Sequence, residues 1–352
     1  MACGPLEEVV VDDAYASSGP GMIHGKVRHH VTVIRARRSL IALIVIVVLV
    51  VLRWSQITDL AGSSRGVLLQ AVVTGLLLGG VYGLVAMGLS LIFGVLGIIN
   101  FAHGTIVTVG LYVSYLLVTD LGLDPYLALP ATVVILFVFG SFIQKFMIRR
   151  TLGQPLENQL LLTVGLSILL QNLLLIFFSP TPRSIRVDYA NTQVDILGAT
   201  ASLSRVIAFV GALIIGLLLW LLLKKTNYGT SIRAVAQNPK GAALVGINVR
   251  QVYIVAFALG IACAGAAASL ILPFLTIDPL VGEPFTILAF VTVILGGLGN
   301  VVGALVGGLV IGLVYEIGGL LLPGQDKLLL VFIVFVLVLL ARPQGLFVRE
   351  HR

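Results

Sequence analysis

Apolar residues occupy this chain in long continuous runs, not in alternating positions. One run extends from Gly66 to Thr119, 54 residues without an aspartate, glutamate, lysine or arginine. A transmembrane helix needs about 20 consecutive apolar residues, whereas a membrane β-barrel shows alternating segments of roughly ten. The pattern therefore predicts membrane-spanning α-helices. After a first run at 39–52, they are expected near 67–89, 101–118, 126–144, 160–178, 205–223, 251–272, 285–315 and 328–341.

Composition agrees with this prediction. Of 352 residues, 59% are hydrophobic and only 11% are charged, whereas a soluble domain carries about 25% charged residues. The remaining polar surface is too small to cover a globule of this size in water. We expect an all-α polytopic membrane protein of about 8 to 10 transmembrane helices, with room for broken or re-entrant segments and an internal repeat.

The charges between the apolar runs predict an orientation. Lysine and arginine collect in the loops 145–159 and 224–250 and in the C-terminal tail, whereas the loops 119–125 and 273–284 carry only acidic residues. By the positive-inside rule, the basic segments are cytoplasmic and the acidic loops face outward. The net charge of +7 then reports cytoplasmic loops rather than a nucleic-acid partner.

The first 66 residues are expected to form two further segments. Residues 1–38 are polar and end in a basic cluster, which indicates a cytoplasmic N-terminal tail, and residues 39–66 hold an extra hydrophobic anchor and a linker.

The sides of the membrane assigned to the loops also constrain the end of the chain. They are consistent if residues 285–341 cross the membrane three times, or once with a re-entrant segment.

One apolar run contains an unusual break, "LSLIFGVLGIINFAHGTIVTVG", residues 90–111. Glycines weaken a helix and asparagine is a preferred N-cap, so Asn100 is expected to start the helix at 101–118 after a turn or half-helix at 91–99. Irregular backbone at membrane depth survives only inside protein or along a cavity. Two interpretations remain open: a capped helix start with a neutral, hydrogen-bonded His103, or a lining of the substrate path by Asn100, Phe101 and His103.

A second site shares part of this pattern. "GIIN" at 97–100 and "GLGN" at 297–300 each place a glycine three residues before an asparagine, a weak indication of an internal repeat that adds Asn300 to the candidate path. Glycines four residues apart, such as Gly75, Gly79 and Gly83, predict that helices approach each other closely.

The basic loop 224–250 shows a short helix of its own. Asn238 followed by Pro239 is a good N-cap and first helical residue, and Gly246 suits the C-terminal end, so a helix is expected at 239–245. A basic loop resting on lipid headgroups would not require two caps. We therefore favour an amphipathic helix that inserts into a groove of a soluble partner.

Motifs for catalysis and for metal binding are missing from the sequence. The only Gly-Lys pair, Gly25-Lys26, is followed by valine, so there is no P-loop, and no cysteine and histidine spacing suggests zinc. We expect no catalytic residues, no metal ligands and no cofactor in this chain.

Four stretches together carry a resemblance to a known family. They are "GLLLGGVYGLVAMGLSLIFGVLGIINFAHG", "RAVAQNPKGAALVGINV", "AFVTVILGGLGNVVGALVGG" and "ARPQGLF". They resemble the permease subunit of branched-chain amino acid ABC transporters, of the LivH type. The resemblance covers about residues 67–348, while residues 1–66 precede the point where the family usually begins.

This resemblance implies the partners and the activity. The subunit would pair with a second homologous permease, two cytoplasmic ATPases that bind ATP and Mg²⁺, and an extracytoplasmic substrate-binding protein, in the bacterial cytoplasmic membrane. It would import branched-chain or other hydrophobic amino acids. The family's coupling segment, which docks on an ATPase, is matched here by Arg233, Ala236, Asn238, Pro239, Ala242, Ala243 and Gly246.

Two alternatives stay open. Close relatives carry urea or short amides, so the match does not identify the cargo. A secondary transporter or a channel for a small neutral solute would also be poor in charge, but ion coupling usually needs an intramembrane carboxylate, and the only near candidate is Glu316.

Overall fold

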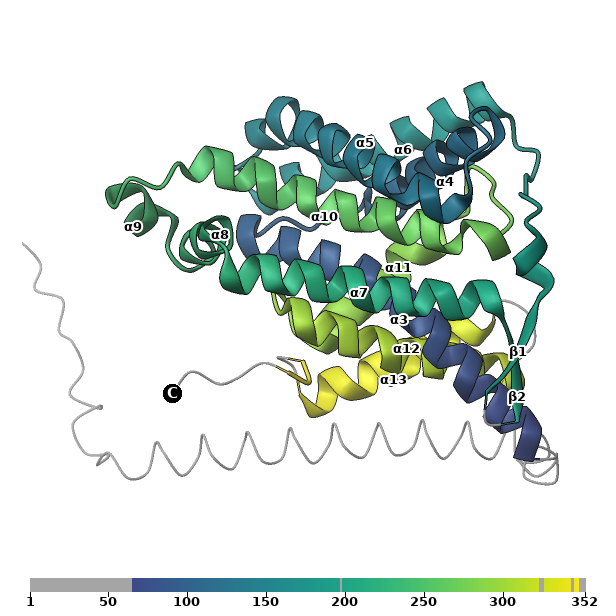
Figure 1. Ribbon diagram of the computed structural model, residues 1–352. Helices are drawn as coiled ribbons and strands as arrows, with labels where there is room; N and C mark the ends of the chain where they lie inside the picture. The colour runs from purple at the N-terminus through teal and green to yellow at the C-terminus, as the bar shows by residue number, and fades with distance from the viewer. Residues whose placement is uncertain (1–64, 197, 323–325, 343–344, 348–352) are drawn as a thin grey trace, which may run out of the picture. The chain divides into compact units, whose positions relative to one another are not determined.

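The computed structural model describes residues 65–347, apart from 197, 323–325 and 343–344 (Figure 1). The predicted tail 1–38 and nearly all of the predicted anchor and linker 39–66 lie outside the described residues. The described part is α-helical except for one small hairpin. Its helices are α3 (Arg65–Leu96), α4 (His103–Thr119), α5 (Pro125–Phe146), α6 (Leu156–Phe178), α7 (Leu203–Lys225), α8 (Asn227–Gln237), α9 (Pro239–Leu244), α10 (Val249–Ile271), α11 (Gly282–Gly296), α12 (Val301–Leu321) and α13 (Lys327–Ala341).

The predicted fold class is confirmed. Six helices of the described part are long and apolar enough to cross a membrane, namely α3, α5, α6, α7, α10 and α12. Three more, α4, α11 and α13, are apolar but shorter. The region expected at 285–341 forms three consecutive helices, because the turn at 297–300 separates α11 from α12.

The short elements lie at opposite ends of the helical bundle (Figure 1). Helices α8 and α9 form one end. The antiparallel strands β1 (Gln193–Ile196) and β2 (Ala199–Ser202) form the other. Close to the hairpin, Asp124 caps α5 by accepting from the Tyr126 N–H at 2.9 Å, and its other oxygen accepts from the Tyr189 hydroxyl at 2.7 Å. Burial, together with this bond, raises the pKa of the Tyr189 hydroxyl above its ordinary value.

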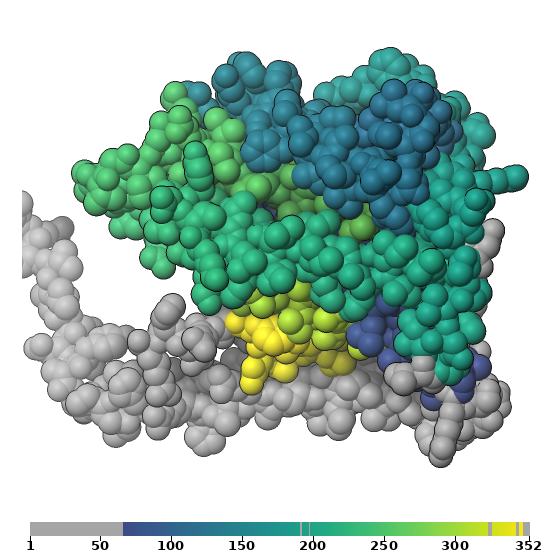
Figure 2. Space-filling model, in the orientation of Figure 1, coloured from purple at the N-terminus to yellow at the C-terminus, as the bar shows by residue number. Residues whose placement is uncertain are grey.

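Helices α3 and α10 form the interior of the bundle. Both are buried over most of their length, whereas α5, α6 and α7 leave most of theirs exposed. On the face shown in Figure 2, α3 is visible only as small dark-blue patches. The exposed residues of the outer helices are large and apolar, such as Val134 on α5 and Ile176 and Phe177 on α6, as lipid contact requires.

Helix α3 packs against α12 through glycines on both helices. A Cβ atom built on Gly75 would lie 2.9 Å from the Gly312 carbonyl oxygen, and one on Gly79 would lie 2.8 Å from that of Gly308. This confirms the close approach predicted from the four-residue glycine spacing. Since lipid offers no hydrophobic drive between helices, such van der Waals contact holds the pair together.

Gly79→Ala is expected to destabilise the protein, because the new methyl group meets the α12 backbone, and overpacking typically costs about 1 to 3 kcal/mol. Gly165→Ala is the matched control. Gly165 lies inside α6 and a Cβ there has nothing within 4 Å, so its melting temperature should stay the same or rise. Thermal unfolding of the detergent-solubilised variants measures both. Equal melting temperatures would contradict this account of the α3–α12 contact.

Candidate functional site

The break within "GIINFAHG" is a non-helical segment that returns along α3. Helix α3 continues to Leu96, residues 97–102 are not helical, and α4 begins at His103. The His103 Nε2–H donates to the Val85 carbonyl oxygen at 3.0 Å. Val85 lies eleven residues before Leu96, so α4 begins about 16 Å back from the end of α3. Six extended residues can cover this distance.

The structure corrects the predicted boundaries of this break. Residues 91–96 remain helical, because Gly94 serves close packing: a Cβ on it would lie 2.9 Å from Gly299 Cα. The helix expected at 101–118 starts two residues later. Asn100 does not cap it, since its Oδ1 accepts from the Ala102 N–H at 3.1 Å and forms a turn ahead of the helix. The sequence pattern located the break but misassigned its two ends.

The candidate path residues of the break differ in their exposure. Asn100 and His103 are fully buried, and the His103 ring is hydrogen-bonded to Val85, which agrees with that part of the first interpretation. Phe101 is half-buried, and its ring packs on that of Phe290 from α11 at a centroid distance of 4.9 Å. Phe101 therefore connects the break to α11.

The second predicted break lies beside the first. Asn300 caps α12 by accepting from the Gly303 N–H at 3.0 Å, and its Nδ2 donates to the Phe347 carbonyl. Gly97 and Gly297 both adopt a positive φ, +69° and +99°. The two sites differ in register, since α12 starts directly after Asn300 while α4 starts three residues after Asn100. The internal repeat stays a prediction.

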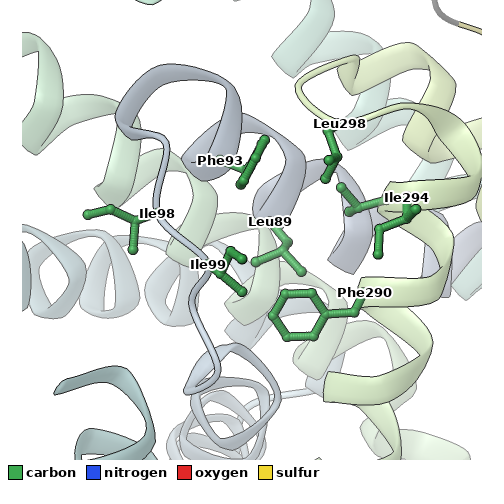
Figure 3. Close-up of a pocket in the computed structure, with 8 residues that line it drawn as sticks. Leu89, Phe93, Ile98, Ile99, Phe290, Ile294 and Leu298 are labelled. Carbon is green, nitrogen blue, oxygen red and sulfur yellow. The ribbon is translucent and has the colours of Figure 1, made fainter. Parts of the chain in front are cut away.

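A small apolar cavity lies between the break and α11 (Figure 3). Its volume is about 130 Å³, and it is partly open to the surface. The side chains around it are aliphatic or aromatic: Leu89, Phe93, Ile98, Ile99, Phe290, Val293, Ile294 and Leu298. The site therefore offers an aliphatic group a place free of polar side chains.

Helix α6 presents a polar stripe to the break, which the sequence analysis missed. Thr163 donates to the Ile99 carbonyl at 3.2 Å, and Ser167 bonds the Thr105 hydroxyl at 2.6 Å. Gln171 Nε2 donates to a carboxylate oxygen of Glu283 at 3.0 Å. These α6 residues are four apart, so they lie on one helix face. Polar residues four positions apart in the apolar run 160–178 were the sequence signal that could have predicted this stripe.

Glu283 is also placed differently from its prediction. It was assigned to an acidic outward loop, but α11 begins at Gly282 and holds Glu283 in its first turn. Gly282 packs against Gly104 at the start of α4. Two residues on, Phe285 makes an edge contact with Tyr82 near the middle of α3, at 6.0 Å between centroids. Glu283 is therefore a carboxylate at the depth of the spanning helices.

The predicted capped helix in the basic loop is confirmed as α9. Asn238 accepts from the Gly241 N–H at 2.9 Å, and Gly246 has a φ of +86° after the last turn. Most of the predicted coupling residues are exposed: Arg233, Ala236, Asn238, Pro239, Ala243 and Gly246.

Ala242 is the exception among the predicted coupling residues, and Leu244 and Val245 lie next to that set. Ala242 is only 4% exposed, because it packs inward and anchors α9. Leu244 and Val245 are 89% and 77% exposed. Two large apolar side chains at the tip of a basic loop form a surface suited to a protein groove.

These features define a class: a multi-pass α-helical membrane protein with interrupted helices and a structured loop helix. Residues 71–340 match the family described as "branched-chain amino acid transport system / permease component". Because this match covers most of the chain, the chain belongs to that family.

Individual relatives agree with the family match. The high-affinity branched-chain amino acid transport system permease protein BraD of Pseudomonas aeruginosa is 31% identical over 296 residues, 80% of this chain and 96% of BraD. LivH of Escherichia coli is 30% identical over 298 residues, with the same shares. A probable LivH of Methanocaldococcus jannaschii is 32% identical over 65% of this chain and 74% of its own length. No solved structure matches.

His103→Gln is expected to insert into the membrane and melt like the unaltered protein, because a glutamine amide can also donate to the Val85 carbonyl. His103→Leu removes the donor and should melt a few degrees lower, as a buried hydrogen bond contributes about 1 kcal/mol. Thermal unfolding of both purified variants checks this. A glutamine variant that melts normally but no longer supports transport would show that the imidazole does more than hold α3.

Proposed function

We propose that this chain is the transmembrane permease subunit of an ATP-driven importer for branched-chain or other hydrophobic amino acids. The supporting observation is the similarity to BraD and LivH across 96% of their length, with the family match at 71–340. The named cargo of these relatives is the basis for the cargo proposed here. The subunit has no catalytic activity of its own.

The proposed assembly supplies what this chain lacks. Its sequence has no P-loop, so two ATP-binding subunits on the cytoplasmic side would bind ATP and Mg²⁺ and provide the energy. A second permease would complete the path, and an extracytoplasmic binding protein would deliver the cargo. The chain itself would lie in the cytoplasmic membrane with α8 and α9 facing inward, as the basic residues Lys224, Lys225 and Arg233 favour.

The proposed path follows the break and α11. The apolar cavity beside Phe290 suits an aliphatic side chain, while the polar stripe on α6 suits the polar part of an amino acid. Phe101 packs on Phe290, which borders the cavity. A path must release what it admits, so selection would rest mainly with the binding protein.

One observation favours a second candidate function. Glu283 is an intramembrane carboxylate of the kind that proton- or sodium-coupled transporters use. ATP dependence separates the two functions. Uptake by the complete assembly that requires ATP inside the vesicle supports the importer, whereas uptake driven by an ion gradient alone supports coupling. Uptake of urea or short amides in preference to leucine would contradict the proposed cargo.

The loop surface formed by Leu244 and Val245 is expected to dock on the ATPase. Leu244→Glu should reduce ATP-driven leucine uptake at least about 10-fold, because a charge is placed in an apolar contact that would otherwise be desolvated. Copurification of the ATPase with the membrane-inserted variant should fall in parallel.

Leu121→Glu is the matched control for this change. Leu121 is 66% exposed in the segment between α4 and α5, and α8 and α9 lie at the other end of the bundle. Its substitution should leave ATPase association intact. Full uptake by Leu244→Glu, or equal losses in both variants, would show that α9 is not the docking element.

A further inference from the structure

Glu283 is a charged residue on an otherwise uncharged helix. It is the only charged residue of α11, and it is exposed in the isolated chain. Its partner Gln171 lies seven residues before Phe178, the last residue of α6, so the pair is about 10 Å inside that end of the helix. A carboxylate at such a depth is expensive and is retained where it faces a cavity, a pathway or a cationic partner.

Among the described residues, the Glu283 carboxylate has one hydrogen-bond partner, the Gln171 amide. Gln171 donates one neutral amide hydrogen bond, whereas a carboxylate has about four acceptor positions. Arg183 follows the end of α6 and Lys327 begins α13, and both have other contacts. Arg183 donates to the Phe178 carbonyl at 2.9 Å and lies over aromatic rings, and Lys327 lies 4.2 Å from the centre of the Tyr315 ring. Glu283 therefore retains capacity for an external cation.

The surroundings of Glu283 fit an amino acid better than an inorganic cation. Gly282 and Gly104 bring the first turns of α11 and α4 together, and no side chain caps either helix. Phe290 lies seven residues further along α11, about 10 Å from Glu283, and borders the apolar cavity. Along α11, the carboxylate of Glu283 thus precedes the apolar cavity beside Phe290.

We propose that Glu283, oriented by Gln171, receives the α-ammonium group of the amino acid during its passage. The inference rests on the proposed function and deepens it. An ammonium group donates charge-assisted hydrogen bonds to a carboxylate, and these are stronger than neutral bonds, more so away from bulk water. Urea and simple amides lack the ammonium group and gain nothing from the charge, so the site favours zwitterionic cargo over neutral cargo.

The test is leucine uptake by the complete transporter, with partner permease, ATPases and binding protein, in proteoliposomes. Glu283→Gln keeps the size of the side chain and can still accept from Gln171, but it removes the charge. We expect uptake of radiolabelled leucine to fall about 10- to 100-fold in kcat/KM, the loss expected for one charge-assisted bond.

Two further variants separate recognition from structure. Glu157→Gln, in the exposed first turn of α6, makes the same chemical change outside the site and should leave uptake unaltered. The exchange Gln171→Glu with Glu283→Gln returns a carboxylate to the pair from the facing helix and should restore at least a tenth of the uptake. A purely structural hydrogen bond predicts no loss in Glu283→Gln.

The outcomes distinguish this inference from the proposed function. If the unaltered transporter shows no ATP-dependent leucine uptake, the proposed function fails. If it does, and Glu283→Gln takes up leucine normally, only the ammonium site fails. If Glu283→Gln loses the second permease on copurification, the carboxylate pairs with that subunit, and the inference is overturned. Loss of uptake with an intact assembly, and rescue by the exchange, supports it.

Discussion

Backbone groups that leave a helix inside a membrane must find partners within the protein, and this constraint organises the structure around α3. The non-helical residues 97–102 are accommodated because they return along α3 and are covered on other sides by α6 and α11. Thr163 accordingly donates to the free carbonyl of Ile99. The buried position of α3 and its glycine contact with α12 both serve to surround this break with protein.

The positions of charged side chains are limited by the same constraint. The spanning helices hold few ionisable groups. Arg183, in the loop after α6, contacts a backbone carbonyl and aromatic rings, and Lys327, at the start of α13, lies over the Tyr315 ring. Glu283 stands apart, because a neutral amide on α6 is its hydrogen-bond partner. A glutamine at this position would avoid the cost of placing a charge at this depth. The carboxylate therefore indicates a function for its charge.

Much of the fold could be predicted from the sequence, since hydropathy determines the spans and the capping residues determine α9. Depth could not. Glu283 and Asp278 read as one acidic loop, but only packing shows that Glu283 enters α11. Gly94 was interpreted as a helix breaker, whereas it serves contact with Gly299. In the same way, Ala242 was grouped with exposed neighbours, because a six-residue helix has too few residues to reveal which side faces the bundle.

The non-helical residues 97–102 also lack the repeated hydrogen bonds of a helix. A helix resists deformation because each turn is tied to the next by hydrogen bonds. This segment is held by separate hydrogen bonds instead: the Gly97 N–H to the Phe93 carbonyl, Thr163 to the Ile99 carbonyl, and the turn at Asn100. Displacement of α4 against α3 is therefore absorbed by a few backbone torsions here. Ile98 and Ile99 border the cavity. A change in the backbone of this segment would therefore change the shape of the cavity.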